Sequence, residues 1–185
     1  MTAIRVYRPA PASGFSWVHP VDNTAAEQLD RISGERLTDW SPPLVKFLPS
    51  NDRHPETDRV PDVPWQGQHS LVFRERAFDL VRPIMEKWGQ FLELRTEESN
   101  ESLWIFNVCT VVDALDEGAS NVLMYPDNVR IMSIPRWVFK PEALAPPVVF
   151  RIPKQRTLLL SGDVVARIRD LGLSGAEFKL LWSSD

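Results

Sequence analysis

The chain has 185 residues, of which 43% are hydrophobic and 25% charged, so it can bury a core and is not a disordered chain. Its 21 Lys and Arg against 25 Asp and Glu give a net charge of −4, which counts against a nucleic-acid-binding protein and suits a basic protein partner. A single cysteine excludes an internal disulfide and indicates the cytoplasm. No apolar run is long enough to span a membrane.

The first third of the chain lacks a sustained apolar period. Residues 1–68 predict an irregular N-terminal region that packs on a core of residues 69–185, in one domain overall. Within this region a helix is expected at 23–32, with Asn23 as its cap. The segment 49–67 carries four prolines among charged residues, which predicts a long polar loop, and loops of that length are usually functional or mobile.

From His69 onward the apolar pattern becomes regular. A short strand at 70–73 is followed by an apolar stripe of helical spacing over 77–88 and by a second strand at 91–94. Both alternating faces of the segment 103–112 are mostly apolar, which predicts a central strand covered on both sides. Asn107 lies inside that segment and would need hydrogen-bond partners if buried. Further strands are expected at 129–134, 137–139 and 148–152.

The end of the chain repeats the order strand, helix, strand. A strand is expected at 157–160, a helix along the apolar stripe of 164–171, and a half-exposed strand at 176–182. Gly89 in the first unit and Gly175 in the second precede the closing strand. We therefore predict an α+β fold: a mixed, mostly antiparallel sheet, a few helices packed mainly on one face, and two similar strand–helix–strand units.

No motif for nucleotide binding, esterase or zinc-protease chemistry occurs, and we expect no cofactor or metal site. Two alternatives remain open. Asp127 with Glu177 and Lys179 is similar to the scattered signature of metal-dependent nucleases, although the last two residues also suit the solvent side of a strand. The second alternative is a non-catalytic module that binds a small ligand or has a structural role. Asp113 and Asp116 would either cap a turn or bind a cation or a basic partner.

The segment Leu103–Asp116, with Ser120 behind it, resembles the central motif of immunity protein family eleven, from bacterial polymorphic toxin and contact-competition systems. The matching motif positions are Asn107, Asp113, Asp116 and Ser120. Residues 34–43, 70–94, 149–152 and 171–182 are similar to flanking parts of the family pattern. Gln90 and Glu93 depart from this pattern, in which an acidic residue and a proline are common at the two positions.

This resemblance implies a non-enzymatic cytoplasmic protein that binds and neutralises a cognate effector toxin encoded beside it, as in competition by type VI secretion. If the toxin is basic, acidic loops would steer it to the complex, and neither nucleic acid nor a membrane takes part. Self-association is left open. The same charges would also suit a solvated loop. The candidate toxin-binding residues are Asp52, Glu56, Asp58, Asp62, Trp65, Glu97, Glu98 and Glu101.

Overall fold

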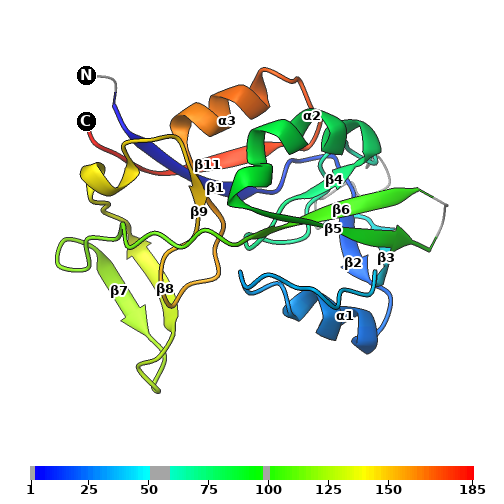
Figure 1. Ribbon diagram of the computed structural model, residues 1–185, viewed down its shortest axis with the longest axis horizontal. Helices are drawn as coiled ribbons and strands as arrows, with labels where there is room; N and C mark the ends of the chain where they lie inside the picture. The colour runs from blue at the N-terminus through cyan, green and yellow to red at the C-terminus, as the bar shows by residue number, and fades with distance from the viewer. Residues whose placement is uncertain (1–2, 51–58, 98–100) are drawn as a thin grey trace.

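The computed structural model describes residues 3–50, 59–97 and 101–185, which form a strand-rich α+β fold (Figure 1). The strands of these residues divide into a five-stranded sheet, a four-stranded sheet and a two-stranded hairpin. Almost all neighbouring strands run antiparallel. The predicted fold class, α+β with mostly antiparallel strands and few helices, is confirmed, with the strands spread over three sheets.

The five-stranded sheet is built around the most apolar segment of the chain. Its strands, in order across the sheet, are β2 (Trp17–Pro20), β3 (Leu44–Leu48), β5 (Gly89–Thr96), β6 (Ser102–Val108) and β4 (Val72–Arg74). Strand β6 is covered on both faces, as predicted. Phe106 and Val108 lie in one hydrophobic cluster, whereas Leu103 and Ile105 lie in a second cluster on the other face.

The strand predicted over 103–112 ends earlier, at Val108. The N–H groups of Cys109 and Thr110 both donate to the carbonyl of Trp88, at 2.9 and 3.1 Å, so the chain leaves the ladder at this point. Val111 is then half exposed. Residues 109–112 were predicted as strand from their hydrophobicity alone, which carries no information about where the backbone bends.

The four-stranded sheet joins the two ends of the chain. Its strands, in order, are β11 (Glu177–Ser183), β1 (Arg5–Ala10), β10 (Leu159–Ser161) and β9 (Val149–Phe150). Residues 1–68 thus supply β1 to this sheet and β2 and β3 to the other, while the boundary at residue 68 stays a prediction. The register of β1 against β11 shifts between Val6 and Tyr7. Leu180, which pairs with Tyr7, is exposed, where strict alternation predicts an inward side chain.

Both predicted strand–helix–strand units are present. The first is β4, α2 (Glu75–Met85) and β5, and the second is β10, α3 (Gly162–Arg169) and β11. In each unit a strand from elsewhere lies between the two strands and runs antiparallel to both: β6 in the first, β1 in the second. A short 3-10 helix, η2 (Glu86–Trp88), links α2 to β5. Helices α2 and α3 contact each other on one side of the fold (Figure 1).

Helix α1 (Asn23–Asp30) covers the opposite face of the five-stranded sheet, where Leu29 packs into the second cluster (Figure 1). Its N-cap is Asp22, whose Oδ1 accepts a hydrogen bond from the N–H of Ala25 at 2.8 Å. The predicted cap at Asn23 was wrong by one position, because either residue type suits a cap and only the backbone turn decides between them.

The hairpin of β7 (Asn121–Met124) and β8 (Ile131–Arg136) extends away from the larger sheets (Figure 1). Within the described part of the chain it forms no ladder with either of them. Ile131 and Ile134 are buried in the first cluster and attach the hairpin to the core. A 3-10 helix, η3 (Pro141–Leu144), follows on the way to β9.

Candidate functional site

The candidate toxin-binding residues fall near one end of the five-stranded sheet. Strands β3 and β5 are parallel, so both end at the same edge, and the segments after residues 48 and 96 leave from that edge. Four candidates lie outside the described residues: Asp52, Glu56, Asp58 and Glu98. We define the acidic edge by the four described candidates, Asp62, Trp65, Glu97 and Glu101.

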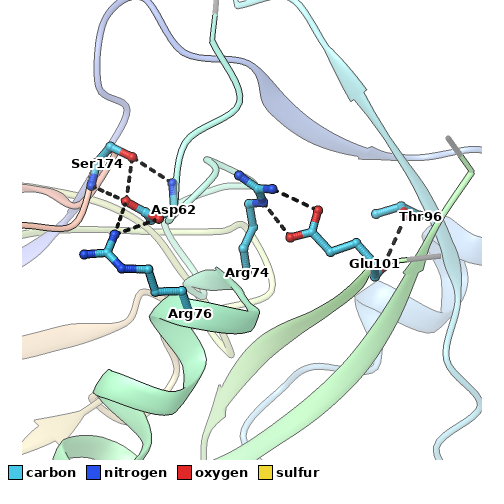
Figure 2. Close-up of polar contacts among 6 residues, drawn as sticks. All are labelled: Asp62, Arg74, Arg76, Thr96, Glu101 and Ser174. Carbon is cyan, nitrogen blue, oxygen red and sulfur yellow. Dashed lines mark hydrogen bonds and ion pairs between the residues drawn. The ribbon is translucent and has the colours of Figure 1, made fainter. Parts of the chain in front are cut away.

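The carboxylate of Asp62 joins two segments that are far apart in sequence (Figure 2). It accepts hydrogen bonds from the N–H and the hydroxyl of Ser174, at 3.0 and 2.8 Å, and the Asp62 N–H donates to the Ser174 hydroxyl at 2.9 Å. The guanidinium of Arg76 lies 3.4 Å away. Burial works to raise the pKa of Asp62, but these bonds and the Arg76 charge outweigh it and hold the pKa below its ordinary value.

Glu101 forms a bidentate ion pair with Arg74, the N-cap residue of α2 (Figure 2). The guanidinium of Arg74 donates both bonds, at 2.7 and 3.1 Å, and its hydrogen bonding to the Glu101 carboxylate raises the pKa of Arg74. The hydroxyl of Thr96 donates to the Glu101 carbonyl at 3.2 Å. The N–H of Arg74 donates to the Asp62 carbonyl at 3.0 Å. Asp62 and Glu101 therefore both stabilise the start of α2, and arginines offset their charges.

The other two described candidates differ in exposure. Glu97 is exposed, and its N–H donates to the Val45 carbonyl at 2.8 Å. Trp65 is half-buried, forms a bridge with Trp17, and accepts a hydrogen bond from the Val18 N–H at its carbonyl. Among the described candidates, Glu97 is thus the carboxylate most accessible to a partner.

Replacing Asp62 with Asn should lower the free energy of unfolding by roughly 2 kcal/mol at neutral pH, because charged acceptors make the stronger hydrogen bonds. The folded-state pKa lies below the ordinary 3.8. The difference between wild type and variant should therefore be complete above that value and shrink as the pH falls below it, through the folded-state pKa. Urea unfolding of both proteins across this pH range measures the difference.

The matched control is Asp79→Asn, which removes the same charge from an exposed position on α2 and should change stability by less than about 0.5 kcal/mol. A difference for Asp62→Asn that stays constant down to the acid limit would contradict the role given to this carboxylate.

Asn107, a motif position in the sequence resemblance, is fully buried and links β6 to the N-terminal region. Its Oδ1 accepts a hydrogen bond from the Gly34 N–H at 3.0 Å, and its Nδ2 donates to the Glu35 carbonyl at 2.7 Å. Its cross-strand neighbour Gln90 exchanges two hydrogen bonds with the backbone of Leu37. The partners that the sequence required for a buried Asn107 are therefore the backbone groups of Gly34 and Glu35, and Gln90 holds Leu37 beside them.

The remaining motif residues shape the chain between β6 and β8. The Oδ1 of Asp116 accepts a hydrogen bond from the Ala119 N–H at 3.0 Å, so Asp116 caps a turn. The Ser120 hydroxyl donates to the Val138 carbonyl and accepts from the Val138 N–H. Asp113 is exposed and lies 3.5 Å from the ammonium of Lys140. Asp113 and Asp116 thus have separate partners, and Asp116 takes the capping alternative.

The residues of the nuclease alternative lie on different elements. Asp127 is in the turn between β7 and β8, where its carboxylate accepts hydrogen bonds from the N–H groups of Val129 and Arg130. These bonds, the one from Val129 first, keep its pKa below the ordinary value. Glu177 and Lys179 are exposed on β11. Within residues 3–50, 59–97 and 101–185, no group of three His, Cys, Asp or Glu side chains could hold a metal ion.

A hollow that the sequence did not indicate lies where β8 faces β1 and β11. It has a volume of about 450 Å³, and the segment before β10 completes its wall. We call it the β8–β11 groove. Of its lining residues only Lys179 was singled out from the sequence, and for a different role. No local signal could have found the groove, because its walls come from both ends of the chain and from the hairpin.

Comparison with known proteins gives one family. No curated protein matches the chain. In the described ranges, no helix has the length and apolar character needed to cross a membrane. The sequence matches the Immunity protein family (Imm11) over residues 17–181. That range contains Asn107, Asp113, Asp116 and Ser120, the motif positions described above. The chain therefore belongs to the immunity protein family Imm11.

Proposed function

We propose that this protein binds a toxin protein encoded beside it and neutralises that toxin by forming a stoichiometric complex in the bacterial cytoplasm. The observation that carries the proposal is the Imm11 match over residues 17–181. Neutralisation of this kind needs tight, long-lived occupancy and no turnover. It depends on a few well-packed anchors that slow dissociation and on charges that speed the encounter.

The polar contacts of the described candidates support a binding role over a catalytic one. Asp62 and Asn107 each make several hydrogen bonds that join distant segments, and Glu101 is paired with Arg74. Such contacts build a rigid scaffold, which lowers the entropy lost when a partner binds. These side chains therefore hold distant segments of the chain in fixed positions.

The acidic edge contributes one contact surface of the complex. Glu97 is exposed there, and half-buried Trp65 forms a bridge with Trp17 at the start of β2. Exposed acidic side chains at this edge would accelerate association with a basic toxin, an effect that salt screens. Trp65 offers the kind of large, amphipathic side chain that anchors interfaces.

Co-purification tests the proposal. The tagged protein and the product of the neighbouring gene are expressed together, and the expected result is a one-to-one complex with a dissociation constant of about 10 nM or tighter. The expected cellular result is growth of toxin-producing cells only when this protein is present.

The control is the same toxin expressed with an unrelated acidic protein of similar size. Absence of a complex at micromolar concentration, with both proteins shown to be folded by circular dichroism, would refute the proposed function.

A further inference from the structure

The β8–β11 groove is lined by cations. Arg8 comes from β1, Arg136 from β8 and Lys179 from β11, and no Asp or Glu is among the described residues that line it. The chain as a whole has a net charge of −4, so this surface has the opposite sign to the molecular average. A positive surface on an acidic protein concentrates negative groups of a partner at one place.

The cations of the groove are close together without internal compensation. Arg8 and Lys179 are directly opposite each other on β1 and β11, where like charges reduce the stability of a sheet. Lys179 follows the core residue Phe178, so the alternation of the strand directs it to the outer face. The guanidinium of Arg8 donates to the neutral carbonyl of Pro9 at 3.2 Å. Within the described ranges no ion pair joins Arg8, Arg136 or Lys179 to a carboxylate.

Two exposed apolar side chains line the same groove. Met132 of β8 is 50% exposed and Leu180 of β11 is 47% exposed. Leu180 pairs with Tyr7, next to the register shift between β1 and β11. An apolar centre with a charged surround is typical of a protein interface, whereas phosphate groups use cations and have no need of apolar contacts. The groove therefore favours a protein segment over a nucleic acid.

The positive surface continues beyond the groove. A second hollow of about 240 Å³ shares Gln155 with it and is lined by four more cations: Arg130, Arg151, Lys154 and Arg156. Two of the four have exposed partners, Asp127 at 3.5 Å from Arg130 and Asp30 at 3.9 Å from Arg156. A partner segment that crosses the groove toward Gln155 would thus meet further positive charge.

We propose that the β8–β11 groove receives an acidic segment of the partner protein, with its carboxylates at Arg8, Arg136 and Lys179 and an apolar side chain between Met132 and Leu180. The inference rests on the proposed function, since the partner is the toxin that this protein neutralises. It adds to the acidic edge a second contact surface of opposite charge, on β1, β8 and β11.

Charge reversal tests the groove. The variant Arg136→Glu with Lys179→Glu reverses two exposed cations of the groove, and Arg36→Glu with Arg167→Glu reverses two exposed cations elsewhere. The two variants have the same net charge, and thermal unfolding followed by circular dichroism checks that both are folded. The groove variant should bind the toxin about 30-fold more weakly or worse, while the control changes by less than about 3-fold.

The outcomes separate the groove from the proposed function. A toxin that binds wild type and groove variant equally well overturns the groove and leaves the immunity function standing. If the toxin does not bind wild type, the immunity function fails, and a labelled poly-glutamate peptide with a central leucine decides on the groove. Binding of this peptide to wild type that the groove variant loses supports an acidic-segment site. If the peptide does not bind, or if a single-stranded oligonucleotide binds more tightly than the peptide, the acidic-segment site is overturned.

Discussion

The variant Gly89→Ala is expected to unfold with a free energy about 3 kcal/mol lower than that of the wild type. A Cβ at position 89 would lie 2.2 Å from the carbonyl oxygen of Asn107 and 2.7 Å from Cζ of Phe106. The backbone at Gly89 is extended, so the cost comes from space and not from conformation. Because one clash is with backbone, β5 and β6 must move apart at the start of their ladder, where Gly89 pairs with Val108.

The matched control for this substitution is Gly118→Ala. A Cβ there would meet its nearest neighbour, the carboxylate of Asp116, at 3.5 Å, which is ordinary van der Waals contact. We expect a change within about 0.5 kcal/mol. Urea denaturation of the three proteins measures both effects, and equal stability of the two variants would contradict the close approach of β5 and β6 at Gly89.

Replacing Asn107 with alanine should also cost about 3 kcal/mol of unfolding free energy. The substitution leaves the N–H of Gly34 and the carbonyl of Glu35 without the partner that the amide provides, and unsatisfied groups are costly when buried. It also opens a cavity beside β6. Residues 34–37 should then exchange their amide hydrogens faster than the rest of the fold, which hydrogen-exchange mass spectrometry measures.

Asn121→Ala provides the comparison, since Asn121 is exposed on β7 and its loss should cost less than about 0.5 kcal/mol. If Asn107→Ala loosened the whole molecule uniformly, with no excess exchange at residues 34–37, the tie between β6 and that segment would be disproved.

The spacing of apolar residues along the chain correctly predicted elements whose burial follows that spacing. The doubly apolar pattern of 103–108 predicted a central strand, and the repeated order of elements predicted the two strand–helix–strand units. The need of a buried Asn107 for partners followed from its chemistry alone. Each of these inferences depends only on neighbours along the chain, which is what a sequence displays directly.

Pairing between distant segments could not be predicted in this way. The insertion of β1 between β10 and β11 depends on pairing across the whole chain, and so does the shift of register next to the Tyr7–Leu180 pair. The acidic edge shows the same limit, because Asp62 has its partner Ser174 112 positions away. Acidic residues in a loop predict a solvated surface. Which of them an arginine or a serine will engage is decided by the fold.

The place of β1 between β10 and β11 has a consequence for biosynthesis. Strand β1 has no neighbour in its sheet until residues 159–161 have been made, and its second neighbour is complete only when Ser183 has been added. Closure of this sheet therefore comes only after translation has passed Ser183, since pairing of distant segments waits for both of them. A product that ends before residue 159 would lack both partners of β1, so this sheet could not form in it.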